Sequence, residues 1–155
     1  MDILQKQNVL NIYIGFDEVE KVAYHTLSQS IIKHASSPVR ISPICSKHFH
    51  KFFNRPRDQK QSNDFSFTRF LVPYLNNYDG YAIFMDCDMM LRGDIFDVLN
   101  EVDLDNAVSV VKHDYTPSDK VKYLNKVQYS YPRKNWSSFV VWNCSHKKNR
   151  ELTPT

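Results

Sequence analysis

Apolar and polar positions along the first third of the chain predict a strand, a helix and a second strand. Val9–Phe16 is rich in β-branched and aromatic residues, which is typical of a buried central strand. Asp17–Ala35 then carries apolar residues at helical spacing, and Asp17 with Glu20 is expected to cap it as a capping box. Val39–Ile44 has the composition of the next strand. A strand–helix–strand unit of this length predicts parallel pairing with a right-handed crossover.

The same alternation continues through the rest of the chain. The segment "DFSFTRFLVPYL" predicts a helix with Asp64 as its cap and Pro73 as a potential kink. The other predicted elements are strands at Tyr81–Met85, Ala107–His113 and Ser137–Cys144 and a short helix at Asp94–Val102 capped by Asp94. The tail after Cys144 is expected to add no closing element.

Two long segments show no clear period. Cys45–Asn63 is basic, which predicts a surface loop or a poorly formed helix, and Asp114–Trp136 is polar and rich in tyrosine. Irregular segments of this length in a compact domain tend to be functional or mobile.

Composition limits the class of protein. The 155 residues, 42% hydrophobic and 24% charged, suit one globular domain, residues 1–155. A net charge of +3 is too weak to indicate nucleic-acid binding, although it is compatible with an anionic ligand. The three cysteines have no CxxC spacing, so we expect reduced thiols and a cytoplasmic protein. Polar residues interrupt the apolar ones in the first fifteen positions, so we expect no signal peptide, and no apolar run in the sequence reaches the length of a membrane span.

The strongest chemical signal is the pair Asp86 and Asp88, which interrupts the apolar stretch "GYAIFMDCDMMLRGDI". Buried charges are costly unless they are paired or bind a metal. Carboxylate oxygens suit Mg²⁺ or Mn²⁺, which keep coordination positions open for diphosphate oxygens. A solvated turn that contains two aspartates by chance is the alternative, and the long apolar strand before the pair favours the metal site.

Several candidate residues follow predicted strands. Asp17, Asp86, Asp88 and His113 all fall at strand carboxyl ends, where α/β sheets bind ligands. We therefore expect them along one rim of the sheet.

The segment "FMDCDMMLRGDI" resembles the DxD segment of GT-A-fold glycosyltransferases, in particular the family 8-like group. "IYIGFDEVEKVAYHTLSQSI" and "QSNDFSFTRFLVPYL" are similar to its opening strand and helix and to the segment before its DxD strand. "VKHDY" and "YPRKNWSSFVVWNC" resemble later blocks of a bacterial and phage branch. The resemblance runs from about Asn11 to the end of the chain, and it implies a GT-A-like (Rossmann-like) α/β fold with a twisted, mainly parallel sheet flanked by helices.

The resemblance also implies roles for five residues. Asp86 and Asp88 would bind a divalent metal, Mn²⁺ or Mg²⁺, that bridges the diphosphate of a nucleotide sugar. Phe16 and Asp17 would contact the nucleoside, and Arg69 would approach the diphosphate or order the aspartate pair. From the residues alone, a strand-end aromatic such as Phe16 is more often a core residue, and Asp17 could be only the helix cap. Arg69 is equally well explained as a surface helix arginine with its stem packed down. The implied reaction is metal-dependent, retaining transfer of a sugar from a UDP-sugar donor to an unknown acceptor.

Further candidates for substrate contact are polar residues near the last strands. Lys134, Asn135 and Trp136 precede a strand and could cradle a sugar, or form an ordinary loop anchored by a tryptophan. His113 and Asp114 invite a ligand role, although a single histidine at a strand end is more often structural. Asn143 interrupts an apolar strand, so its amide needs a backbone or ligand partner.

Two other functions stay open. Family 8-like proteins usually continue into a C-terminal segment with a further metal-binding histidine, so this chain is expected to be C-terminally truncated or minimal. A nucleotide-sugar-binding domain without efficient turnover is therefore the non-enzyme alternative. A haloacid-dehalogenase-type phosphatase also has DxD after a strand, but its motif is usually near the N-terminus and is not followed by residues such as Met89 and Met90.

Overall fold

The structure is a computed structural model that describes residues 7–56, 58, 61, 63–113, 121–122, 126–127 and 134–154. Within these residues the strands form a five-stranded sheet of order β2-β1-β3-β7-β4 and a separate pair, β5-β6. The strands are β1 Leu10–Gly15, β2 Val39–Ile44, β3 Tyr81–Met85, β4 Val108–His113, β5 Val121–Lys122, β6 Lys126–Val127 and β7 Lys134–Asn143. The α-helices are α1 Lys21–His34, α2 Val72–Leu75 and α3 Ile95–Asn100, and the 3-10 helices are η2 Glu18–Glu20, η3 Ser46–His48, η4 Thr68–Leu71 and η6 Lys147–Glu151.

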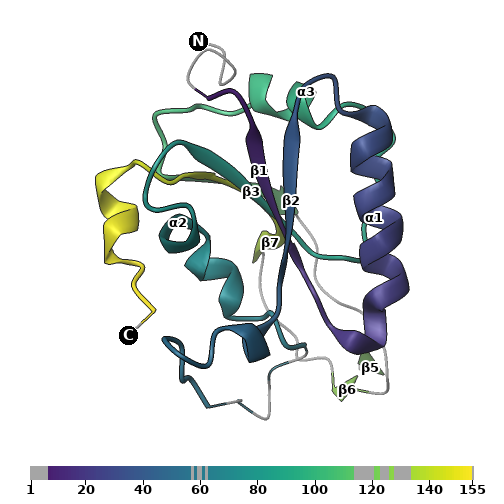
Figure 1. The fold of residues 1–155 in the computed structure, drawn as a ribbon, viewed down its shortest axis with the longest axis vertical. Coiled ribbons are helices and arrows are strands. Elements are labelled where there is room, and N and C mark those ends of the chain that lie inside the picture. The colour runs from purple at the N-terminus through teal and green to yellow at the C-terminus, as the bar shows by residue number, and fades with distance from the viewer. Residues whose placement is uncertain are drawn as a thin grey trace.

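The sheet is mixed but mainly parallel. β1 pairs in parallel with β2 and β3, whereas β7 pairs antiparallel with both β3 and β4. Four strands therefore point in one direction, and their carboxyl ends share the lower edge of the sheet in Figure 1. Because β7 runs the other way, its first residues lie at this same edge. The predicted mainly parallel α/β architecture is confirmed.

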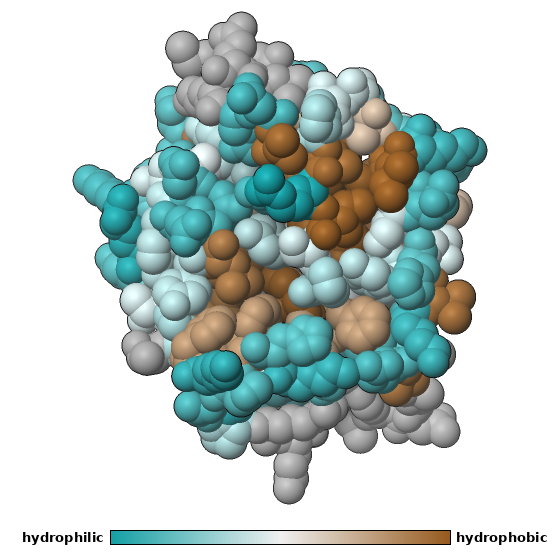
Figure 2. All heavy atoms as spheres, in the orientation of Figure 1, coloured by the Kyte–Doolittle hydropathy of each residue, from teal (hydrophilic) through white to brown (hydrophobic). Residues whose placement is uncertain are grey.

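Helices flank both faces of the sheet. Figure 1 shows α1 on one side and α2 with η6 on the other. All five residues of β3 are buried, as expected for a central strand covered on both faces. Helix α1 turns Leu27, Ser30 and Ile31 inward. On the outside, Figure 2 shows a largely polar face with apolar side chains gathered between β2 and α1.

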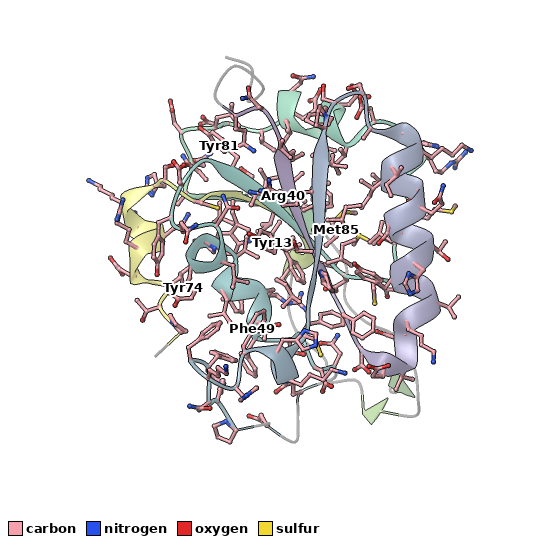
Figure 3. The ribbon with its side chains drawn as sticks, viewed as in Figure 1. Tyr13, Arg40, Phe49, Tyr74, Tyr81 and Met85 are labelled. Atoms are coloured by element: carbon pink, nitrogen blue, oxygen red, sulfur yellow. The ribbon has the colours of Figure 1, made fainter. Side chains whose placement is uncertain are left out.

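A polar cluster joins β1 to the end of α2. The Tyr13 hydroxyl donates to Asn76 Oδ1 at 3.1 Å, and Asn11 Nδ2 donates to the same oxygen at 2.7 Å. Arg40 lies beside Tyr13 on this side of the sheet (Figure 3) and donates to Asn11 Oδ1 at 3.2 Å. Burial raises the pKa of Tyr13 to about 12. The cluster thus satisfies polar groups that lie between the sheet and α2.

Several predicted elements are confirmed. The strands Val39–Ile44 and Tyr81–Met85 have the predicted bounds. Asp94 caps α3 by accepting a hydrogen bond from Phe96 N at 3.0 Å. The three cysteines are free and buried. Among the described helices, none has the length and apolar character needed to cross a bilayer.

The helix predicted from Asp64 onward is wrong in its first half. The helical elements begin at Thr68 with η4 and continue as α2, and Asp64 caps neither of them. Pro73 lies in the first turn of α2, where its missing N–H has no helical partner to lose, so it starts the helix instead of kinking it. The reason for the late start is a tertiary contact: the Asp64 N–H donates to Asp17 Oδ2 at 3.4 Å.

Two smaller predictions also need correction. Asp17 caps η2, accepting from Val19 N at 3.1 Å, but Glu20 does not complete a capping box because its carboxylate accepts from the Cys87 thiol. The tail is not without structure. It forms η6, in which the buried Asn149 side chain donates to Ala107 O and Asn143 O.

Candidate active site

The ends of β1 and β3 lie next to each other, so Asp17 after β1 is near the pair Asp86 and Asp88 after β3. Ile14 pairs with Met85, so the residues after each leave the sheet side by side. β7 extends this edge, because Asp86 N donates to Ser138 O at 2.8 Å beyond the last paired residues of β3. The segments that carry Asp17, Asp86 and Asp88 therefore start from neighbouring points on one rim, as expected from the sequence.

Arg69 connects the segments that meet at this rim, because it contacts both Asp86 and Ser137. Its Nη2 lies 3.2 Å from Asp86 Oδ1, and the side chains are only 9% and 20% exposed. Nη1 donates to Ser137 O at 2.7 Å, and the guanidinium carbon lies 4.9 Å from the centre of the Phe84 ring. Burial lowers the pKa of Arg69 from its ordinary value, while the charges of Asp86 and Asp88 oppose that shift. The arginine thus orders Asp86 and neutralises part of the acidic pair.

A glycine explains how Arg69 reaches this position. A Cβ on Gly15 would lie 2.3 Å from the Phe65 ring, so only glycine lets that ring pack against the end of β1. Phe65 is buried and lies 6.4 Å, centre to centre, from the Phe84 ring. This packing brings the segment 64–69 across the carboxyl ends of β1 and β3. As a result, Arg69 lies within ion-pair distance of Asp86.

The two aspartates have different surroundings. Asp86 is half-buried beside Arg69, whereas Asp88 is exposed. Cys87 between them is buried, and its thiol donates to Glu20 Oε2 at 3.4 Å. Burial, together with the Glu20 carboxylate, raises the pKa of Cys87 far above its usual range. The thiol therefore stays protonated and ties the turn to the start of α1, which leaves Asp88 facing outward.

Asp17 and Phe16 lie at the neighbouring strand end. The Asp17 carboxylate accepts from Val19 N and from Asp64 N, so it both caps η2 and holds the segment 64–69. The Phe16 ring packs edge-on against Tyr24 at 5.3 Å between centroids. Both residues are only partly buried. These contacts account for the helix-cap and packing alternatives and leave part of each side chain accessible to a ligand.

The remaining predicted site residues divide into two groups. The β4–β7 register pairs His113 with Lys134, Lys112 with Asn135 and Val111 with Trp136, which places this backbone at the carboxyl edge with Asp86. Asp114 lies outside the described residues. Asn143 pairs with Tyr81 at the other end of β3, and its amide donates to Leu104 O at 2.9 Å. The structure does not bring Asn143 to the aspartates.

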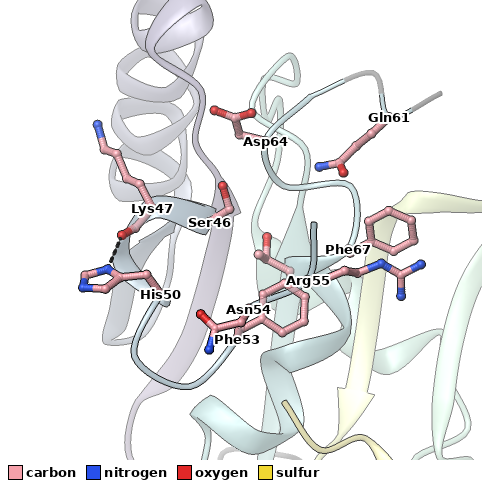
Figure 4. Close-up of a pocket in the computed structure, with 10 residues that line it drawn as sticks. Ser46, Lys47, His50, Phe53, Asn54, Arg55, Gln61, Asp64 and Phe67 are labelled. Atoms are coloured by element: carbon pink, nitrogen blue, oxygen red, sulfur yellow. Dashed lines mark hydrogen bonds between the residues drawn. The ribbon is translucent and has the colours of Figure 1, made fainter. Parts of the chain in front are cut away.

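A cavity of about 340 Å³ lies at the same edge, beyond the ends of β1 and β2 (Figure 4). Its lining comes from the segment after β2 and from residues 61–68, including Phe53, Asn54, Arg55, Phe67 and Thr68. The sequence predicts a surface loop or a poorly formed helix at Cys45–Asn63, functional or mobile. The sequence does not predict which side chains of this segment line the cavity, because they do so together with residues that come after the segment, such as Asp64 and Phe67.

Comparison with known proteins agrees with this geometry. Residues 2–149 match the sequence model of Glycosyl transferase family 8. The chain is similar to Protein CDI of Arabidopsis thaliana, with 44% identity over 145 residues that make up 92% of this chain and 56% of that protein. It thus spans little more than half the length of this relative.

Solved structures share the fold at low sequence identity. An apo structure of the bifunctional glycosyltransferase WbbM matches with a TM-score of 0.62 and 15% identity, covering 94% of this chain and 33% of that one. The glycosyltransferase GlyE of Streptococcus pneumoniae TIGR4 matches with a TM-score of 0.59 and 15% identity, covering 96% and 37%. The fold is therefore that of glycosyltransferase structures, and the chain belongs to Glycosyl transferase family 8.

Proposed function

We propose that this domain binds a nucleotide-sugar donor, a UDP-sugar, at the rim formed by Asp17, Asp86 and Asp88, and transfers the sugar to an acceptor. The observation that carries the proposal is the buried Arg69–Asp86 pair at the end of β3, beside an exposed Asp88. A surface arginine and a solvated turn would not require this burial. Such an arrangement presents one fixed carboxylate and one accessible carboxylate at the edge where α/β sheets bind ligands.

The carboxylates of Asp86 and Asp88 suit a divalent cation whose other ligands are oxygens of the diphosphate. Among the described residues no cluster of three or more His, Cys, Asp or Glu side chains could enclose a metal. Mg²⁺ and similar hard cations are usually held by one or two carboxylates plus substrate phosphates, which is what Asp86 and Asp88 offer. When bound, Mn²⁺ or Mg²⁺ would neutralise the negative charge that develops on the departing diphosphate.

The residues of the chain itself would orient the donor. Arg69 fixes Asp86, and the Cys87–Glu20 hydrogen bond fixes the turn that presents Asp88. Phe16 and Asp17 are proposed to contact the nucleoside because they end the neighbouring strand. His113, Lys134, Asn135 and Trp136 end or begin strands at the same edge. These four residues, with Asp114, are proposed to contact the sugar or the acceptor, with retention of the anomeric configuration as the family resemblance implies.

The second candidate function is donor binding without efficient turnover. Its support is that no group of three or more His, Cys, Asp or Glu side chains among the described residues could hold a metal without further ligands. Transfer requires water to be excluded from the donor, which otherwise is hydrolysed.

The two functions are separated by measuring released UDP and glycosylated product together. The chain is incubated with UDP-sugars, Mn²⁺ and candidate acceptors. We expect donor binding with slow turnover, in which hydrolysis competes with transfer. Fast, acceptor-dependent UDP release with little hydrolysis would show an efficient transferase. If UDP and UDP-sugars neither bind nor react, the proposed donor site is wrong.

A further inference from the structure

The cavity beyond β1 and β2 is separate from the proposed donor residues. Phe16, Asp17, Arg69, Asp86 and Asp88 do not belong to its lining. Its volume of about 340 Å³ is at the lower end of the range for small-molecule pockets, large enough for one ring with its substituents. A ligand in this cavity could therefore be bound at the same time as a donor.

The lining combines aromatic rings with uncharged hydrogen-bonding groups. Phe53 and Phe67 supply apolar faces, and Ser46, Asn54 and Gln61 supply hydroxyl and amide groups (Figure 4). A sugar ring needs both kinds of surface, because its C–H faces pack on aromatic rings while its hydroxyls require donors and acceptors. The composition of the cavity thus matches a hydroxyl-rich ring.

Arg55 gives the cavity its charge preference. The guanidinium carbon lies 3.8 Å from the centre of the Phe67 ring, so the side chain is held in place by stacking. Arg55 forms no ion pair with any described residue, whereas Lys47 on the opposite wall is paired with Glu18 at 2.7 Å. Asp64, which is negatively charged, also lines the cavity. The positive charge available to a ligand is therefore that of Arg55. A preorganised guanidinium is suited to bidentate binding of a carboxylate or phosphate.

We propose that this cavity is a second ligand site, which binds a sugar ring carrying a phosphate or a carboxylate. The anionic group binds Arg55, the ring packs on Phe53 and Phe67, and the ring hydroxyls bond to polar groups of the lining such as Ser46 and Asn54. The site does not depend on the proposed donor function. It is nevertheless linked to the donor residues, because Asp64 N bonds to Asp17 and Thr68 directly precedes Arg69.

The test is saturation-transfer NMR on the full 155-residue chain, with glucose 6-phosphate, glucuronate and glucose as probes and inorganic phosphate as a competitor. We expect signals from glucose 6-phosphate or glucuronate, whichever source of negative charge fits, and a weaker signal from glucose. Arg55→Gln should weaken binding of the anionic sugar by about tenfold or more, because it removes a charged hydrogen-bond donor.

The control variant is Arg150→Gln. Arg150 is also an exposed arginine near an aromatic ring, 5.9 Å from the centre of Tyr78, but it does not line the cavity. Equal signals from wild type and Arg55→Gln, no signal from either anionic sugar, or equal competition by inorganic phosphate would overturn the proposal. A parallel titration with UDP and Mn²⁺ keeps the two sites apart: loss of sugar binding with intact UDP binding concerns the cavity alone.

Discussion

Arg69 and Asp86 are brought into contact from segments 17 residues apart in sequence, and their ion pair of 3.2 Å is mostly covered by protein. Removing the arginine would leave Asp86 beside apolar rings without this counter-charge. Arg69→Gln is expected to lower the free energy of unfolding by about 1–3 kcal/mol, the usual cost of an unsatisfied buried group. Urea denaturation followed by tryptophan fluorescence measures this change.

Arg40→Gln is the matched control for Arg69→Gln. Arg40 is exposed and bonds to Asn11 Oδ1 at 3.2 Å, so its loss should change the unfolding free energy by less than about 0.5 kcal/mol. Equal stability of the Arg69 variant and the Arg40 variant would contradict a structural role for the Arg69–Asp86 pair.

Gly15 is expected to be intolerant of a side chain. In Gly15→Ala the new methyl group would overlap the Phe65 ring, so the segment 64–69 must shift, at a cost of about 1–3 kcal/mol. UDP binding should fall as well, because Arg69 moves with Phe65. Gly93→Ala is the control, since a Cβ there meets no atom within 4 Å. Thermal unfolding and UDP titration measure the stability and the UDP affinity of both variants. Equal stability and equal UDP affinity of Gly15→Ala and Gly93→Ala would contradict this role of Gly15.

The Asp94 carboxylate should make stability depend on pH in the acidic range. Slight burial raises its pKa, but hydrogen bonds from Ser36 and Phe96 N outweigh this and lower the pKa below its ordinary value. The folded state therefore gains stability from the ionised form above the unfolded pKa, near about 3.9, and loses it as the pH falls through the folded pKa. Asp94→Asn keeps an N-cap residue but no charge.

We expect the stability difference between wild type and Asp94→Asn to favour wild type at pH 6 and to shrink as the pH falls below the unfolded pKa of about 3.9. Chemical denaturation at several pH values measures it. A difference that stays constant or grows on acidification would mean that the Asp94 carboxylate is not stabilised by these bonds.

The parts of the site that follow a single strand could be predicted from the sequence. Tyr81–Met85 is apolar throughout and is followed directly by Asp86. The strand and the position of the acidic pair at its carboxyl end therefore depend only on neighbouring residues in the sequence. Asn143 illustrates an intermediate case: its amide was expected to need a partner, and the structure supplies a backbone carbonyl, Leu104 O.

Features that depend on distant contacts could not be predicted. The apolar spacing after Asp64 suggests one continuous helix, but Phe65 packs under Gly15 and Asp64 bonds to Asp17, and these contacts override the local helical pattern. Glu20 has the spacing of a capping box, yet a thiol 67 residues later binds its carboxylate. The cavity likewise needs side chains from both ends of a long irregular segment.

Isothermal titration calorimetry of UDP binding, with and without Mn²⁺, is the most direct test of the proposed donor site. Two carboxylates and a diphosphate repel one another unless a cation lies between them. We therefore expect wild type to bind UDP only with Mn²⁺ present. Asp88→Asn, which keeps size but removes charge at an exposed position, should fold normally and bind at least about tenfold more weakly. Asp105→Asn, an exposed aspartate that precedes β4 at the opposite edge, should bind like wild type. Equal affinity of wild type and Asp88→Asn, or UDP binding that persists unchanged in EDTA, would contradict a metal-bridged donor site at Asp86 and Asp88.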